Sequence, residues 1–480
     1  MKVTKYLLAG ALMMGLSGSA FAQEVNYMEA LKPISEALNA DPENPKAAKD
    51  LVKDYLKVYK KDAAAIIGLG ATYLQVHNFD KATEMADLVL ANKKMNQSDA
   101  YVLLGDIAAL QDSVGNAGAA ATQYQTAISI DPHNVSAYER YARVYRHVNP
   151  QTAVAKLEEL RKVKPDYPVE VKAAEIMLSD QKYAEAAAWF EKANPSQLDE
   201  TAYYQFVVAE FYSGNSKKAL EVSRDGLKAH PGSEYLSRLA VMAAVEEKAF
   251  PEALTYSENV MRGRERKNFN DWYYYGQALA GNNKFQEAIK AYNMCLELKA
   301  DNAEPLAKLA AAYKGLGDGD NALKYQRQYL DKSDNVTTTD WADLAYIYVG
   351  MGDQCDSIDR AKAVGYYNEA MGVYETMTEK FPSLKDWCWV AEASVALGKL
   401  KDLDKVSELY KRVAAFEEAK AEKDATTINY LSAAYYFLGY YYMGKNDVEL
   451  GKSYFEKLLQ IDPNNVEAKK ALGLDQAAAE

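Results

Sequence analysis

The residues whose types suit metal or nucleophilic chemistry are few and scattered. They are four histidines and three cysteines: His77, His133, His147, His230, Cys295, Cys355 and Cys388. None of the histidines has a second histidine or a cysteine at the spacing that holds a zinc ion. The acidic segment Asp353–Asp359 carries three carboxylates, but it lacks the glycine and the terminal glutamate of a calcium-binding EF-hand loop. We therefore expect no metal site.

Sequence motifs of known catalytic sites are also missing. Neither G-x-S-x-G, H-E-x-x-H, a complete phosphate loop G-x-x-x-x-G-K-[ST], nor a helix-opening G-x-G-x-x-G occurs. Acidic pairs such as Glu158–Glu159 and Glu417–Glu418 are abundant. No histidine or serine lies near them to complete a catalytic set, and such pairs usually form the solvated faces of helices. The sequence predicts a protein that is not an enzyme and needs no cofactor.

A small residue recurs along the chain at nearly constant intervals. It stands at Ala82, Ala120, Ala153, Ala186, Ala219, Ala253, Ala288 and Ala322. Each step is 33 to 35 residues, except a first step of 38 residues that contains a glycine-rich insertion at Gly115–Gly118. Longer steps lead to Ala363, to Val406, where a larger residue replaces the small one, and to Gly451. Insertions near 353–360 and 417–424 account for the added length. Such a period is the signature of a repeat array.

The best-defined repeat occupies residues 270–300. It reads Trp272-x2-Tyr275-Gly276-x2-Leu279, followed by Ala288-x3-Tyr292. This resembles the tetratricopeptide pattern W-x2-L-G-x2-Y…A-x3-F. Segments beginning at Leu69, Leu104 and Leu438 are similar. The resemblance covers roughly residues 28–465 and implies an all-α fold, a right-handed α-solenoid of about ten to eleven helix pairs.

The turns inside the repeats are expected to contain glycine. Gly214, Gly317, Gly352, Gly398 and Gly444 fall between the two helices of a repeat, where a helix end favours glycine in the left-handed conformation. Cys295 falls at an apolar helix position, as a buried thiol does. Cys355 is expected in the loop inside one repeat, and Cys388 at the start of the next repeat. Because a helix of about 13 residues would separate them by about 20 Å, no disulfide is expected.

The resemblance also implies a binding surface. Trp272 and Tyr275 are expected to face neighbouring helices, whereas Tyr273, Gln277 and Ala280 lie on another face, which in tetratricopeptide proteins lines a concave groove. In another repeat the same helical phase places Glu139 in the groove. Applied to all repeats, this phase predicts the residues that bind a partner. The partner-binding candidates are Arg143, Arg146, Tyr204, Phe211, Tyr273, Gln277, Tyr346, Tyr436 and Tyr440.

The composition limits the class of partner. The formal net charge of −12 argues against nucleic acid as the main ligand. Tyrosine is in excess, at 37 of 480 residues. A groove of aromatic side chains with a pair of arginines suits a peptide or a partner-protein segment, with arginine for a carboxylate. The expected function is a non-enzymatic protein–protein interaction scaffold of unknown oligomeric state. The alternative is an exported glycan-binding module, because aromatic side chains also stack on sugars.

The first 22 residues have the pattern of a signal peptide. Lys2 and Lys5 precede an apolar run, and the segment ends in Ala20-Phe21-Ala22. We expect cleavage after Ala22, export to the periplasm and no membrane-spanning segment. A helical pair at 23–61, a repeat array at 62–465 and a capping helix at 466–480 would follow.

Overall fold

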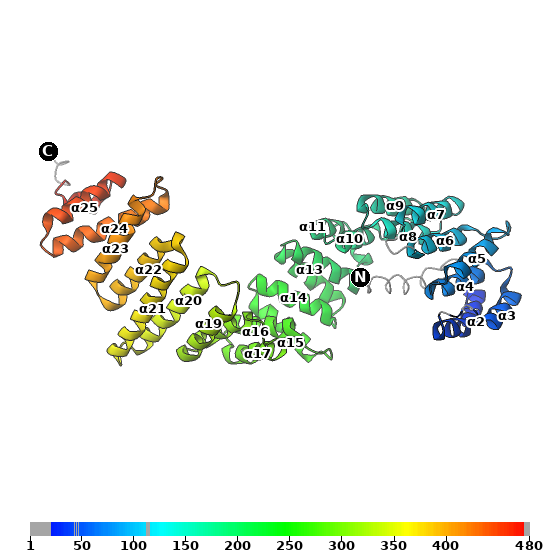
Figure 1. Ribbon diagram of the computed structural model, residues 1–480, viewed down its shortest axis with the longest axis horizontal. Helices are drawn as coiled ribbons and strands as arrows, with labels where there is room; N and C mark the ends of the chain where they lie inside the picture. Colours follow the sequence, from blue (N-terminus) through cyan, green and yellow to red (C-terminus); the bar gives the residue numbers. More distant parts are fainter. Residues whose placement is uncertain (1–20, 43, 45, 47, 112–115, 475–480) are drawn as a thin grey trace. The chain divides into compact units, whose positions relative to one another are not determined.

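The computed structural model describes residues 21–42, 44, 46, 48–111 and 116–474, and every regular element within them is helical (Figure 1). The predicted all-α fold is confirmed. Apart from its last two residues, which begin the first helix, the expected signal peptide lies outside the described residues. The chain divides into two compact units, one ending at Glu247 and the other beginning at Lys248.

The first unit consists of helices that pack on their neighbours in sequence. It begins with α2 (Phe21–Ala40) and α3 (Lys49–Tyr59). Five pairs follow: α4 (Ala63–Gln75) with α5 (Phe79–Leu90), α6 (Ser98–Gln111) with α7 (Ala117–Ile130), α8 (Val135–Tyr145) with α9 (Pro150–Val163), α10 (Val169–Ser179) with α11 (Tyr183–Phe190), and α12 (Glu200–Tyr212) with α13 (Ser216–Ala229). A 3-10 turn, η2 (Pro195–Gln197), precedes α12, and α14 (Glu234–Glu246) ends the unit.

The second unit is built in the same way. It begins with α15 (Phe250–Arg262) and continues with α16 (Phe269–Gly281) and α17 (Phe285–Leu298), α18 (Glu304–Gly315) and α19 (Gly319–Lys332), α20 (Thr338–Cys355) and α21 (Arg360–Lys380), α22 (Lys385–Val395) and α23 (Leu403–Glu418), and α24 (Ala425–Gly444) and α25 (Val448–Ile461). The 3-10 turn η3 (Pro382–Leu384), the π-helical turn η4 (Ala396–Leu400) and the six-residue α26 (Val466–Ala471) complete it.

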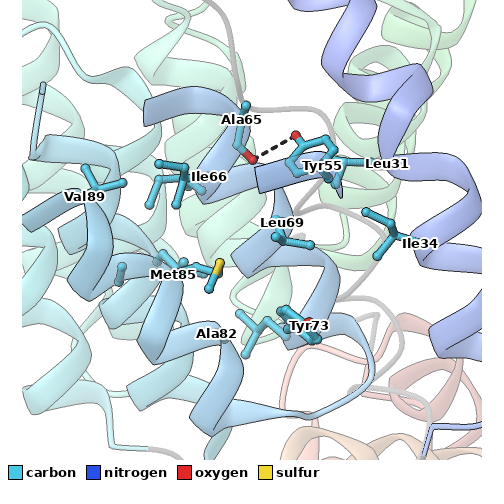
Figure 2. Packing of buried hydrophobic residues seen from close by; sticks show 14 of the residues in the cluster. Leu31, Ile34, Tyr55, Ala65, Ile66, Leu69, Tyr73, Ala82, Met85 and Val89 are labelled. Carbon is cyan, nitrogen blue, oxygen red and sulfur yellow. Dashed lines mark hydrogen bonds between the residues drawn. The ribbon is translucent and has the colours of Figure 1, made fainter. Parts of the chain in front are cut away.

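The recurring small residues lie at the closest approaches between helices. All eight alanines of the predicted period, together with Ala363 and Val406, are 0 % exposed. Figure 2 shows the first of these positions, Ala82 on α5, close to Tyr73 on α4. In the same view the hydroxyl of Tyr55 donates to the carbonyl oxygen of Ala65 at 3.0 Å, which ties α3 to α4. The predicted period is therefore the packing period of the core.

The turns between paired helices differ in part from the expectation. Gly214 and Gly317 do adopt the left-handed conformation, with φ of +90° and +74°. Gly352 instead lies inside α20, Gly398 lies in η4, and Gly444 ends α24 without a positive φ. In two of these repeats the left-handed position is taken by a later residue, Lys401 after Gly398 and Asn446 after Gly444. In other turns it is taken by His77, Gln181, Lys248 and Asn283. The prediction of a left-handed conformation was therefore wrong for Gly352, Gly398 and Gly444.

The segment 353–360 is only partly a loop, because its first three residues extend α20 and only residues 356–359 lie between the two helices. Helix α20 continues to Cys355, so this cysteine is helical and not in a loop as expected, and α21 begins at Arg360. Asp353 accepts a hydrogen bond from the hydroxyl of Tyr367 at 2.7 Å and pairs with Lys399 at 2.6 Å. The extension is thereby fastened to the π-helical turn of the next repeat. All three cysteines are free thiols, as expected.

Within the described part of the chain, no helix is both long enough and apolar enough to cross a membrane.

Candidate binding site

Helix α8 and the residue that caps its C-terminus carry three arginines on one face. The first turn of α8 is capped by Asn134, whose side chain accepts the backbone N–H of Ala137. Ala137, Tyr138 and Ala142 are buried, which fixes the rotation of the helix. Arg140, Arg143 and Arg146 follow at intervals of three residues and lie together on the remaining side.

These arginines line a cavity of about 350 Å³ between α8 and α10, which we call the arginine cavity. Its wall is made by α8, by Leu157 of α9, by Tyr167 before α10, and by α10 itself. The lining residues are Glu139, Arg140, Ala142, Arg143, Arg146, Leu157, Tyr167, Lys172, Glu175 and Ile176. The structure thus brings together three residues that the helical phase predicted for the groove: Glu139, Arg143 and Arg146.

Most charges around the arginine cavity already have partners. The Nε atom of Arg140 donates to both carboxylate oxygens of Asp106, each at 2.9 Å. Lys172 pairs with Glu175 at 2.9 Å. The hydroxyl of Tyr167 donates to Glu139 at 2.9 Å. These pairs hold the walls of the cavity in place.

Arg143 and Arg146 are the exceptions. Among the described residues, Arg143 has no hydrogen-bond or ion-pair partner, and Arg146 has no carboxylate partner. Both side chains are half-buried. Burial and the neighbouring charge of Arg143 lower the pKa of Arg146. Two adjacent guanidinium groups that make no ion pair in a concave wall are candidates to bind an anion.

The other candidates of the first unit lie on α12. Tyr204 is exposed and packs edge to face against Tyr235 of α14, with ring centroids 6.4 Å apart. Phe211 is half-buried and packs edge to face against Tyr212. Tyr204 therefore offers an accessible ring, and Phe211 offers part of one.

The candidates of the second unit fall into two kinds. Tyr346 on α20, and Tyr436 and Tyr440 on α24, are 41–49 % exposed. The ammonium group of Lys314 lies 5.7 Å from the ring of Tyr346, and the rings of Tyr436 and Tyr440 contact each other edge to face at 5.0 Å. These three rings are open to a partner.

Tyr273 differs from the expectation of a free groove ring. It is half-buried, stacks on Phe269 at 5.7 Å and lies 6.3 Å from Tyr292. Burial raises the pKa of its hydroxyl. Trp272, which was expected to be the buried neighbour, is also only half-buried and belongs to the same apolar cluster. Gln277, one turn further on, is half-buried as well. Tyr273 thus contributes to packing.

The sequence did not single out the four other polar residues that line the arginine cavity: Arg140, Tyr167, Lys172 and Glu175. Arg140 could have been found, because it stands three residues before Arg143 on the same helical face. The other three belong to the next repeat and to the turn before it. Their approach to α8 depends on how successive repeats stack, which no local pattern encodes.

Two of the three thiols, those of Cys295 and Cys388, are buried. Burial raises the pKa of Cys295 to about 12. Burial, with the charge of Asp386, raises that of Cys388 to about 11. At neutral pH both therefore stay protonated, and thiols in that form are poor nucleophiles.

Comparisons with known proteins agree with this architecture. A family model described as the tetratricopeptide repeat matches residues 432–465. No curated protein matches the chain. Among solved structures, the C-terminal part of a TPR repeat-containing protein from Cytophaga hutchinsonii is 18% identical, with a TM-score of 0.43 over 56% of this chain and 99% of that chain.

Two further structures are similar at the same level. MamA from Desulfovibrio magneticus is 18% identical, with a TM-score of 0.32 over 35% of this chain and 96% of that one. YrrB, described as a TPR protein with an unusual peptide-binding site, is 17% identical, with a TM-score of 0.34 over 39% of this chain and 97% of that chain. The matched repeat has the same glycine-on-aromatic packing, Gly439 against Phe455, as Gly105 against Tyr124 and Gly276 against Tyr292. The chain thus carries a tetratricopeptide repeat at residues 432–465.

Proposed function

We propose that this protein is an interaction scaffold whose arginine cavity binds a carboxylate-bearing segment of a partner protein. The observation that carries the proposal is the pair Arg143 and Arg146, which line a concave wall without a carboxylate partner. A guanidinium group binds a carboxylate through two parallel hydrogen bonds, which gives both strength and orientation. The partner would satisfy the two cations that the chain itself leaves open.

The other residues of the cavity narrow the class of ligand. Glu139 and Glu175 line the same wall, so a ligand with dense negative charge, such as a phosphate dianion, would meet two carboxylates. A single carboxylate that is flanked by backbone N–H groups suits this wall better, because the carboxylate can pair with the arginines and the N–H groups can donate to the glutamates. The volume of about 350 Å³ is that of a short peptide segment and not of a folded surface. Tyr204 lies in the same unit and is exposed, so its ring is available to the residues of the partner segment that flank the carboxylate.

Loss of the two arginines is expected to abolish most of the binding. A five-residue peptide that ends in two glutamates serves as the probe, and its amidated version with two glutamines as the neutral comparison. In calorimetric titrations of the full chain, the Arg143→Ala/Arg146→Ala variant should bind the acidic peptide at least tenfold more weakly, because each charge-assisted contact contributes about 1.5–3 kcal/mol. The neutral peptide should bind weakly to both proteins.

The matched control removes two exposed arginines elsewhere, Arg266→Ala/Arg412→Ala, and therefore changes the net charge equally. This control should keep the affinity of the native chain. Equal weakening by both double variants would show that long-range charge, and not the arginine cavity, attracts the peptide. Tight binding of the neutral peptide would contradict the role of the carboxylate.

We also propose that the protein acts after export. The motive is the charged, apolar and Ala-Phe-Ala pattern of the first 22 residues. Intact-mass analysis of protein from the periplasmic fraction of the producing cells should give a chain that begins at Gln23. A chain that still carries Met1 would contradict export by this route.

A further inference from the structure

The residue after Arg146 connects the arginine cavity to the end of α10. The Nε atom of Arg146 donates a hydrogen bond to Nε2 of His147 at 2.9 Å. The other ring nitrogen of His147, Nδ1, lies 2.5 Å from a carboxylate oxygen of Asp180, the residue that follows α10. His147 is thus held between a cation and an anion.

This arrangement fixes the tautomer of the ring. A guanidinium group only donates hydrogen bonds, so Nε2 must be the unprotonated, accepting nitrogen. The proton of the neutral ring then sits on Nδ1 and is donated to Asp180. In this state the Nε–H group of Arg146 is occupied by His147, and only the terminal nitrogens remain for a ligand.

We propose that His147 is a pH-dependent positioning residue for the arginine cavity, which takes a carboxylate more tightly when the His147 ring is protonated. The inference rests on the proposed function. A protonated ring carries a hydrogen on both nitrogens, so Nε2–H would face the Nε–H of Arg146. That contact cannot persist, whereas the contact with Asp180 becomes an ion pair and holds the ring. The Nε–H of Arg146 is released.

Protonation of His147 strengthens carboxylate binding in two ways. The released Nε–H and a terminal N–H of Arg146 form the fork that binds a carboxylate with two hydrogen bonds. The ring also adds a positive charge beside the cavity, which favours any anion bound there. The charged groups that the structure ties to this ring are Arg146, its neighbour Arg143, and Asp180. Histidine changes its charge between about pH 5 and 8, within the range in which a peptide carboxylate stays ionised.

The test is a titration of the full chain with the peptide that ends in two glutamates, at pH 7.5 and pH 5.5. The native chain should bind about three- to tenfold more tightly at pH 5.5, the gain expected from one further hydrogen bond. The variant His147→Gln should show less than a twofold change, because its amide oxygen accepts from Arg146 at either pH.

The outcomes separate the two proposals. Failure of the peptide to bind at either pH would contradict the proposed function. Binding that is equal at both pH values, or that rises equally in His147→Gln, would overturn the role of His147 and leave the arginine cavity in place. The other histidines, His77, His133 and His230, stay in the variant chain, so their titration cannot imitate the expected difference.

Discussion

Replacement of Tyr124 by alanine is expected to lower the free energy of unfolding of the first unit by about 3–5 kcal/mol. Tyr124 lies on α7 and is 1 % exposed. Its ring covers Gly105 of α6, where an added Cβ would lie only 2.3 Å from the ring. Because glycine has no side chain that could move into the vacated space, the alanine variant keeps a cavity of nearly the size of the ring.

The hydroxyl group of Tyr124 also contributes a hydrogen bond to the free energy of unfolding. It donates to Asp106 at 2.8 Å, and the same carboxylate accepts from Arg140, which lines the arginine cavity. Tyr124→Phe keeps the ring and removes only this hydrogen bond, so it should cost about 1–2 kcal/mol. The difference between the two variants is the contribution of the ring.

Urea unfolding, combined with hydrogen exchange of α6 and α7, measures both effects. Repeat arrays unfold in parts, so the exchange of these two helices assigns the loss to this repeat. The control is Tyr235→Ala, since Tyr235 is 58 % exposed; it should cost less than about 1 kcal/mol. Similar losses from Tyr124→Ala and Tyr235→Ala would show that the period of small and aromatic residues is not the packing period.

Residues such as Ala153 and Ala288 could be predicted because the contact they make is repeated in every helix pair. Wherever two helix axes approach closely, only a small side chain fits, so the constraint returns at each repeat. The segment 353–360 was misplaced because an added turn of helix and an added loop lengthen the period equally. No glycine or proline stands between Gly352 and Arg360 to mark the end of the helix, so the sequence did not show that α20 continues to Cys355.

The binding site was predictable only where one helix carries it. Arg143 and Arg146 follow from the phase of α8, which its buried alanines determine. Lys172 and Glu175 come from the next repeat, and their distance from α8 depends on stacking. Tyr273 and Tyr346 have the same phase on equivalent helices, yet Phe269 covers Tyr273 from one turn before, whereas Tyr346 stays exposed. The neighbour, and not the phase, decides whether a ring is free.

Replacement of Lys420 by methionine is expected to lower the free energy of unfolding of the second unit by about 2–4 kcal/mol at pH 7. The Nζ atom of Lys420 lies 2.6 Å from Glu417 and 3.1 Å from Asp386. The carboxyl side chains are only 0 % and 9 % exposed, so methionine would leave this buried acidic pair without a cation. Breaking a fully buried pair costs about 3–5 kcal/mol; the lower range applies because the lysine side chain is 36 % exposed.

The loss should depend on pH in a definite direction. Burial alone would raise the pKa of Asp386, but hydrogen bonds from Glu417, from the backbone of Trp387 and from Lys420 hold it below its usual value. In the native chain this stabilisation is present above the pKa of an unfolded aspartate, about 3.9, and is lost as the pH falls through the lower folded value. Without Lys420, one of the interactions that lower this pKa is lost, so the folded variant takes up a proton at a higher pH than the native chain, and its loss of stability shrinks as the pH falls.

The difference between the native chain and Lys420→Met should therefore be largest near pH 7 and shrink towards pH 4. Urea unfolding at both pH values, combined with hydrogen exchange of α22 and α23, measures it. Lys57→Met is the control: Lys57 and Asp54 lie 2.7 Å apart, but their side chains are 64 % and 73 % exposed, so the unfolding curve should not move. An equal loss at pH 7 and pH 4 would mean that the apolar stem of Lys420, and not its charge, stabilises this repeat.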